Sequence, residues 1–234
     1  MVLREKRTSP SEVTSMFDDF ADTFEQKLMS ELNYVAPFEI ATTIAKRQNE
    51  TATTDSAPKL YQSALDAGCG TGLMGIGLRS LVKGPLVGVD LSPKMVELAG
   101  ELVLDTEGIS EKGIRRCTKE TKDALANTHS IYDGVFVADL LDIDGTAKFI
   151  DSGVKSPTKV IPNAVDLITS ADVLCYFGDL LGILKAFANR LVPGGDLVFS
   201  TETVKDGDYN WVMLESERFA HNPKYVLKMA TFRS

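Results

Sequence analysis

The feature that most constrains the fold is a glycine-rich segment, LDAGCGTGLMGIGL, at residues 65–78. It follows a short apolar run and precedes a stretch of helical periodicity, so we expect it to join a strand to a helix. Glycine lets the backbone turn tightly and approach a ligand without a Cβ clash, and the free amides of the following helix offer partial positive charge. The segment therefore predicts a nucleotide-binding turn.

Two ligand classes compete for this turn. Gly70, Gly72 and Gly75 fit the dinucleotide-binding pattern G-x-G-x-x-G, so an NAD(P)-dependent oxidoreductase is one alternative. Asp66 argues against it, because a carboxylate just ahead of the turn would repel a pyrophosphate and attract an ammonium group. Asp90 ends the next apolar run, where one carboxylate can accept hydrogen bonds from both hydroxyls of a ribose.

A third acid extends this interpretation. Asp139 closes the third apolar run, where it could accept a hydrogen bond from an adenine amino group. A ligand with an adenosine, an amino-acid ammonium group and no phosphate is S-adenosyl-L-methionine, which we therefore expect as the cofactor. The residues expected to bind it are Asp66, Gly68, Cys69, Gly70, Thr71, Gly72, Asp90, Leu91, Met95, Asp139, Leu140 and Ser170.

From Lys59 onward, short apolar runs alternate with helical patterns, as in βαβ units with a parallel sheet. The expected strands are residues 60–65, 86–89, 134–138, 164–169 and 196–201. The expected helices are residues 73–82, a helix opened by Ser92-Pro93 that includes Leu102 and Val103, residues 179–191 ended by Pro193-Gly194-Gly195, and residues 223–232. Residues 105–130 interrupt the rhythm and are predicted to be a partly helical insertion.

The N-terminal region predicts a helical cap. Ser9-Pro10-Ser11-Glu12 has the pattern of a capping box with proline at the first helical position. A second helix should begin at Pro37, and residues 49–58 form a polar linker, so we divide the chain into a cap and linker at 1–58 and a main domain at 59–234. The apolar stripe of the first helix is Val13, Phe17, Phe20, Phe24, Leu28 and Leu32, and the inward residues of the second are Phe38, Ala41, Ile44 and Ala45.

In order and spacing, four motifs resemble those of class I S-adenosylmethionine-dependent methyltransferases over residues 60–202. They are the D-x-G-x-G-x-G turn from Asp66, the acids Asp90 and Asp139, and the P-G-G turn from Pro193. The resemblance implies an α/β, Rossmann-like, doubly wound and mostly parallel sheet of order 3-2-1-4-5. Such enzymes add a C-terminal hairpin after strand five, and we expect that hairpin to be missing here. The segments MFDDFADTFEQKL, SADVLCYFGDL and ERFAHNPKY are similar to methyltransferases attached to tetratricopeptide repeats.

Net charge and the number of cysteines limit the classes of binding partner and the cellular location that we expect. The 25 Lys and Arg against 33 Asp and Glu give a net charge of −8, which repels nucleic acid and anionic membranes. The longest uncharged stretch, residues 67–78, is shorter than the roughly 20 residues that cross a bilayer. Three distant cysteines and two histidines favour a reducing compartment and argue against disulfides or a metal site. We expect a cytoplasmic protein, and the sequence leaves its oligomeric state unknown.

The sequence does not identify a catalytic residue. Methyl transfer needs a nucleophile held in line with an activated methyl group, and proximity can supply roughly 7–11 kcal/mol of the barrier. Residues 170–172 follow the fourth expected strand and would lie near the reacting atoms, with Tyr176 and Phe177 as candidate pocket walls and His221 as a candidate base. The acceptor is an unidentified small molecule or protein. A non-catalytic cofactor-binding module is the other alternative.

Overall fold

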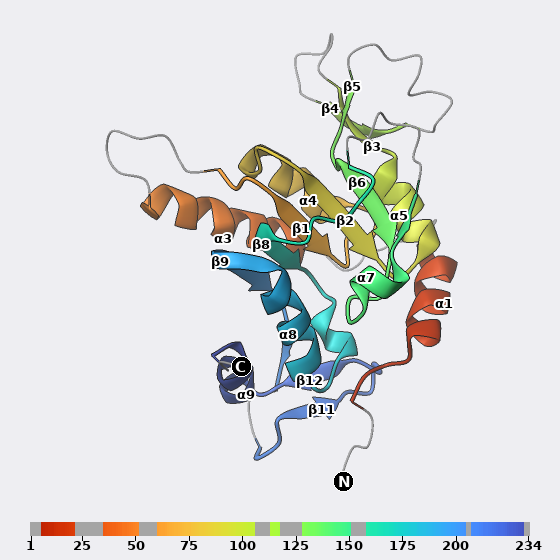
Figure 1. Ribbon diagram of the computed structural model, residues 1–234. Helices are drawn as coiled ribbons and strands as arrows, with labels where there is room; N and C mark the ends of the chain where they lie inside the picture. Colours follow the sequence, from red (N-terminus) through yellow and green to blue (C-terminus); the bar gives the residue numbers. More distant parts are fainter. Residues whose placement is uncertain are drawn as a thin grey trace.

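The computed structural model describes residues 6–21, 35–51, 60–105, 113–117, 128–150, 158–204 and 207–231. Its central sheet has the strand order β7-β6-β2-β1-β8-β9 (Figure 1). All neighbouring pairs are parallel except β6 with β7, which is antiparallel. The strands are β1 (Ala64–Ala67), β2 (Leu86–Asp90), β6 (Gly134–Val137), β7 (Lys148–Phe149), β8 (Val165–Ser170) and β9 (Leu191–Phe199).

Helices pack on both faces of this sheet, because successive side chains of each strand point to opposite faces and most of them are apolar. Ala64, Leu86 and Leu167 share one core with the helices of one face, and Leu65, Val87 and Ile168 share another core with the helices of the other. The first group of helices is α3 (Ala36–Thr51), α4 (Leu73–Leu78) with the 3-10 helix η2 (Arg79–Leu81), and α5 (Pro93–Gly100). The second group is α7 (Ile143–Thr146), α8 (Leu181–Arg190) and α9 (Pro223–Ala230).

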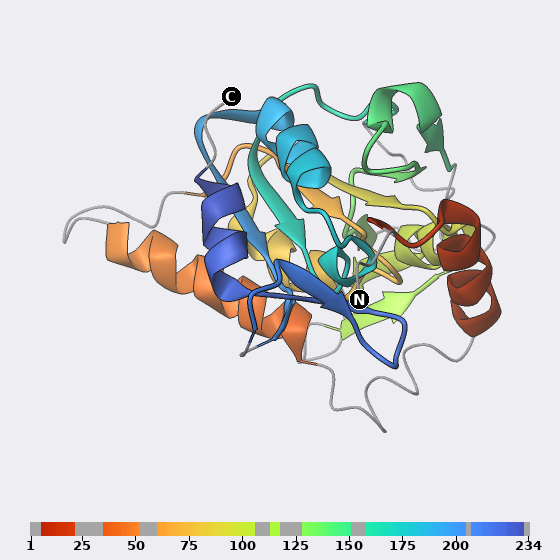
Figure 2. The same ribbon diagram turned by 90° about the horizontal axis from the view of Figure 1, so that it is seen from below.

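The N-terminal helix α1 (Pro10–Phe20) begins with the predicted capping box, in which Ser9 and Glu12 satisfy each other's backbone amides. The last three residues of its expected apolar stripe lie outside the described residues. Helix α1 contains no buried residue and lies at the opposite end of the molecule from α9 in both views (Figures 1 and 2). It is therefore a peripheral element rather than part of the core.

Helix α3 is longer than the sequence pattern predicts, because residues 49–51 of the expected linker continue it. Residues 52–58 of that linker lie outside the described part. Ala41 and Ile44 are buried as predicted, but the prediction for Phe38 is wrong, since 41% of this residue is exposed. Ile40 takes the inward position instead, because two helical residues differ in direction by about 200°.

The prediction for the segment after α5 is also wrong. The helix ends at Gly100, a poor helix former, and Leu102 and Val103 belong to strand β3 (Leu102–Asp105). This strand pairs antiparallel with β4 (Gly113–Arg116) and β5 (Thr128–Ser130). Apart from Cys117, the described residues of the expected partly helical insertion therefore form strands.

The C-terminal part adds a second small sheet that the sequence analysis does not predict. Its order is β10-β12-β11, from β10 (Glu202–Thr203), β11 (Trp211–Met213) and β12 (Phe219–His221). In the described part of the chain, β9 is the edge of the central sheet. Pro193-Gly194-Gly195 lies inside β9, opposite a register shift between Val165 and Leu167, so the fifth strand begins earlier than predicted. None of the helices described has the length and apolar character needed to span a bilayer.

Candidate functional site

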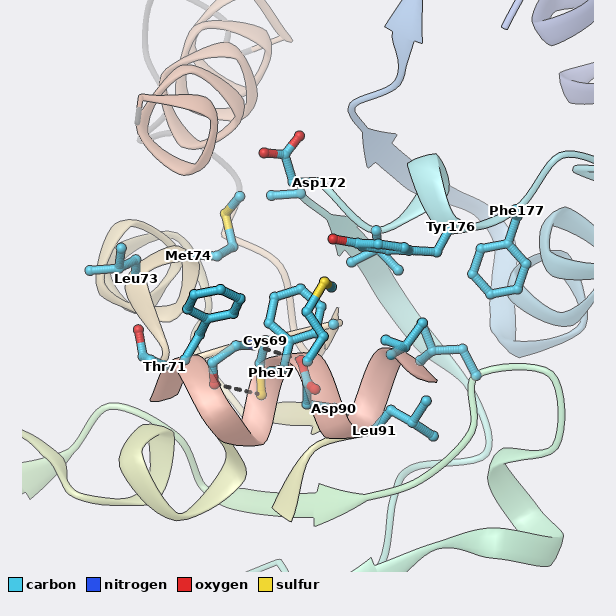
Figure 3. A pocket seen from close by; sticks show the side chains of 18 of the residues that line it. Phe17, Cys69, Thr71, Leu73, Met74, Asp90, Leu91, Asp172, Tyr176 and Phe177 are labelled. Atoms are coloured by element: carbon cyan, nitrogen blue, oxygen red, sulfur yellow. Dashed lines mark hydrogen bonds between the residues drawn. The ribbon is translucent and has the colours of Figure 1, made fainter. Parts of the chain in front are cut away.

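A cavity of about 320 Å³ lies at the carboxyl ends of the parallel strands (Figure 3). Its wall includes residues 68–71 after β1, residues 90–91 at the end of β2, residues 138 and 140 after β6, and residues 171–173 after β8. Open α/β sheets bind ligands where the strand order reverses, and here the reversal falls between β1 and β8. The volume is within the range of about 300–1,000 Å³ that is typical of small-molecule pockets.

The glycine turn forms one wall of this cavity. Gly68, Gly70 and Gly72 have φ angles of +80°, +51° and +98°, in the left-handed region that favours glycine. A Cβ on Gly68 would lie 2.1 Å from the side chain of Val173, whereas a Cβ on Gly70 would meet no atom within 4 Å. The backbone at Gly70 therefore has room for a ligand to approach closely.

Asp90 faces the same space. One of its carboxylate oxygens accepts a hydrogen bond from the backbone N–H of Gly70 at 2.9 Å, and the other accepts one from Ser92 at 2.9 Å. Burial raises the pKa of Asp90, and the backbone amides of Ser92 and Gly70 oppose this shift. The Leu91 amide opposes the shift as well, and a carboxylate has about four acceptor positions, so acceptor capacity remains for a ligand hydroxyl group.

Thr71 carries a further unused polar group in this wall. It is 2% exposed, and its Oγ1 has no hydrogen-bond partner among the described residues. The Arg116 guanidinium of β4 donates to the carbonyl oxygen of Thr71 at 2.9 Å, which fixes the backbone of the turn. A buried hydroxyl normally has a partner, so the donor set of the turn fits a polar ligand group at Thr71.

The structure places Asp66 behind the turn rather than in the cavity wall. The residue is fully buried and accepts hydrogen bonds from the hydroxyls of Tyr132 at 2.6 Å and Thr169 at 3.2 Å. Burial raises the pKa of Asp66 to about 7. Tyr132 in turn accepts from the backbone N–H of Gly75 at 3.1 Å, which connects Asp66 to the start of α4. The expected direct contact between Asp66 and an ammonium group does not agree with this placement.

Four other predicted binding residues, Gly72, Met95, Asp139 and Ser170, are also absent from the lining. Gly72 caps α4, Met95 is fully buried in α5, and the Ser170 hydroxyl donates to the carbonyl of Ala67 at 2.9 Å. The Ser170 bond joins the ends of β8 and β1, where the turn begins. The predicted residues that do line the cavity are Gly68, Cys69, Gly70, Thr71, Asp90, Leu91 and Leu140.

Asp139 has a partner that the sequence analysis misses. The Arg7 guanidinium donates to both of its carboxylate oxygens at 2.9 Å, and the backbone N–H of Leu141 adds a third bond at 3.0 Å. Arg7 itself lines the cavity and lies over the Phe177 ring at 4.8 Å. No local motif marks Arg7, because its partners are distant in sequence.

Helix α1 supplies a cavity wall as well. Val13, Met16, Phe17 and Phe20 line the cavity, and the Phe17 ring meets the Tyr176 ring edge-on at 5.7 Å between centroids. The spacing of these four residues in the sequence is the signal that places them on one face of α1. Tyr176 and Phe177 also line the cavity, but His221 does not, since it is buried in β12 and its Nε2 bonds with the carbonyl of Phe177.

Fold and site together define an α/β protein with a mostly parallel sheet and a small-molecule cavity at the reversal of strand order. Residues 25–230 match the family model described as "Methyltransferase domain", so the chain belongs to this family. No curated protein sequence matches the chain. The described residues hold no group of three His, Cys, Asp or Glu that could bind a metal ion.

Several solved structures share the fold. Magnesium protoporphyrin IX methyltransferase from Synechocystis PCC 6803, solved with bound SAH, is 14% identical over 94% of this chain and 86% of that one, with a TM-score of 0.53. A SAM-dependent methyltransferase from Leishmania major is 14% identical over 94% and 70%, with a TM-score of 0.52. The [4+2]-cyclase SpnF is 13% identical over 96% and 72%, with a TM-score of 0.59. At these identities the likeness concerns the fold alone.

Proposed function

We propose that this chain transfers a methyl group from S-adenosyl-L-methionine to an acceptor, and that the cavity at the tips of β1 and β2 binds the cofactor. One observation carries the proposal: the open backbone at Gly70 and the carboxylate of Asp90 share the cavity wall and are hydrogen-bonded to each other. The cations of the wall, Arg7 and Arg218, are paired with acids, which disfavours the pyrophosphate of NAD(P).

The lining residues suggest a role for each part of the site. Asp90 would accept hydrogen bonds from the ribose hydroxyls, and the backbone of residues 68–71 with the Thr71 hydroxyl would hold the amino-acid end. Leu91 and Leu140 would flank the adenine, and Asp139 has about one acceptor position left for its amino group. Asp66, Gly72, Met95 and Ser170 would keep the turn in shape without touching the ligand.

When bound, S-adenosyl-L-methionine supplies a sulfonium-activated methyl group for in-line displacement by a nucleophile. The residues of this chain would bind and orient the two reactants and exclude water from the cavity. Such positioning can lower the barrier by roughly 7–11 kcal/mol without a catalytic triad.

Because α1 closes one side of the cavity, a small-molecule acceptor is favoured over a protein. The three free, buried cysteines suit the expected cytoplasmic location, and the likeness to repeat-attached methyltransferases stays a prediction.

Calorimetric titration with S-adenosylhomocysteine, the demethylated product, tests the proposal. Asp90→Ala should weaken binding by roughly 10- to 100-fold, since a hydrogen bond to a charged group contributes about 1.5–3 kcal/mol. Glu97→Ala is the control, because it removes an exposed acid from neighbouring α5. Unchanged affinity in Asp90→Ala, or tighter binding of NAD(P) than of S-adenosylhomocysteine to the wild type, would contradict the proposal.

A further inference from the structure

The same cavity is also lined by residues outside the proposed cofactor site. These residues come from α1, α4 and the segment after β8, and most of their side chains are aromatic or aliphatic. Figure 3 shows Tyr176 and Asp172 on the side away from Asp90 and Leu91. We use "acceptor chamber" for the part lined by Phe17, Phe20, Met74, Asp172, Tyr176 and Arg218.

Charged side chains gather where this chamber meets solvent. The guanidinium of Arg218 pairs with the carboxylates of Asp172, at 3.3 Å, and of Glu202. The three side chains are each about a third exposed, at 36% for Asp172, 29% for Arg218 and 32% for Glu202. Two carboxylates against one guanidinium leave this group with a net negative charge. The net charge of these three side chains therefore favours a positively charged ligand group beside them.

The backbone holds Asp172 firmly in place. Its φ angle is +57°, a left-handed conformation that is uncommon for a residue with a side chain. Its N–H donates to the Ser200 hydroxyl at 2.8 Å, and its carbonyl oxygen accepts from the Cys175 thiol at 3.3 Å. These bonds fix the backbone, and the ion pair with Arg218 restrains the side chain, so the carboxylate loses little conformational entropy when it binds a partner.

The aromatic rings of the chamber also favour a cation. The Arg218 guanidinium already lies 5.9 Å from the centre of the Tyr176 ring, and the Phe17 ring meets the Tyr176 ring edge-on. Aromatic faces attract cations through the ring quadrupole, and more strongly where water is excluded. The two carboxylates already paired with Arg218 would repel an anionic group that approaches it.

We propose that the acceptor is a small amphipathic amine, with its apolar part among the rings of the acceptor chamber and its ammonium group at Asp172. This inference rests on the proposed function and adds the class of substrate. It assigns binding and specificity to Asp172 and leaves open which atom of the acceptor is methylated.

Binding of matched probes to protein saturated with S-adenosylhomocysteine tests the inference without measuring activity. The probes are 2-phenylethylamine, 3-phenylpropanoate and 2-phenylethanol, which share one ring and differ in charge. By calorimetry or ligand-observed NMR, the amine should bind at least 10-fold tighter than the acid. In Asp172→Asn this preference should disappear, and asparagine tolerates a left-handed backbone, so the fold should survive. Glu97→Gln, which removes a distant exposed acid, should keep the preference.

The outcomes separate the two proposals. If S-adenosylhomocysteine does not bind, the proposed function fails before the probes are used. If it binds but the acid or the alcohol binds as well as the amine, or no probe binds, the amine inference alone is overturned. Retention of the full amine preference in Asp172→Asn also overturns it.

Discussion

Gly70 and Gly194 provide a matched pair at the scale of the residue. Both have left-handed φ angles, +51° and +81°, and a Cβ on either would meet no atom within 4 Å. Only Gly70 lines the cavity. Each alanine variant should lose a similar stability of about 1–2 kcal/mol, because the conformational cost is the same. Only Gly70→Ala should also weaken binding of S-adenosylhomocysteine, by at least 10-fold in calorimetry.

Equal affinity in the two alanine variants would contradict this account of the turn. A loss of affinity in Gly194→Ala would do so too, since Gly194 lies in the bulge of β9 and outside the cavity lining. As a control, thermal unfolding of both variants shows whether each one is folded.

Asp66 should make stability depend on pH. Its pKa is raised by burial from 3.8 to about 7, so the folded state binds a proton that the unfolded state releases between these values. Stability from this group is therefore present at low pH and is lost as the pH rises through about 7. Between pH 5 and pH 8 the loss should be about 3 kcal/mol. Chemical denaturation of wild type and Asp66→Asn over this range measures it as a change in their stability difference.

A stability difference between wild type and Asp66→Asn that stays constant with pH would show that Asp66 keeps an ordinary pKa. Because asparagine does not titrate, the change of this difference with pH comes from Asp66. The informative quantity is the slope rather than the offset.

The sequence identifies acids at strand ends but not which way they face. Asp90 lies in the cavity wall, and its role as ribose acceptor stays a prediction. Asp66 has the same local signature, yet its carboxylate points to Tyr132, which is 66 residues away in the chain. Contacts between distant residues, such as this one and that of Arg7 with Asp139, leave no local pattern to detect.

At the scale of the element, α1 depends on polar contacts rather than on burial. It has no buried residue, and Asp18 accepts from the Ser92 hydroxyl at 2.5 Å, while Lys94 donates to the Asp18 carbonyl at 2.9 Å. Asp18→Ala should therefore increase hydrogen exchange in α1 with little change in the global unfolding temperature. Asp19→Ala, an exposed neighbour, is the control. Unchanged exchange in Asp18→Ala would show that apolar contacts at the cavity hold the helix.

Elements with an unambiguous local signal could be predicted from the sequence, and elements whose residues fit both a helix and a strand could not. The capping box at Ser9 fixes the start of α1, because both of its hydrogen bonds are local. Leu102 and Val103 fit a helical stripe and a strand equally well, and the pairing with β4 and β5 decides for the strand. Strands β10 to β12 have two or three residues each, too few for a periodic signal.

At the scale of the whole molecule, the α/β fold with a mostly parallel sheet was predictable from alternating apolar runs, and it is confirmed. The same fold occurs in a [4+2]-cyclase as well as in methyltransferases. A fold of this kind therefore does not by itself define the reaction. The chemistry depends on what the cavity holds and how it is held.

The most direct test is the structure of this protein in complex with S-adenosylhomocysteine. We predict that the ligand lies in the cavity at the tips of β1 and β2, with its ribose hydroxyls in hydrogen-bond contact with the Asp90 carboxylate and its amino-acid end against residues 68–71. A ligand bound elsewhere, or one whose ribose leaves Asp90 without contact, would contradict it.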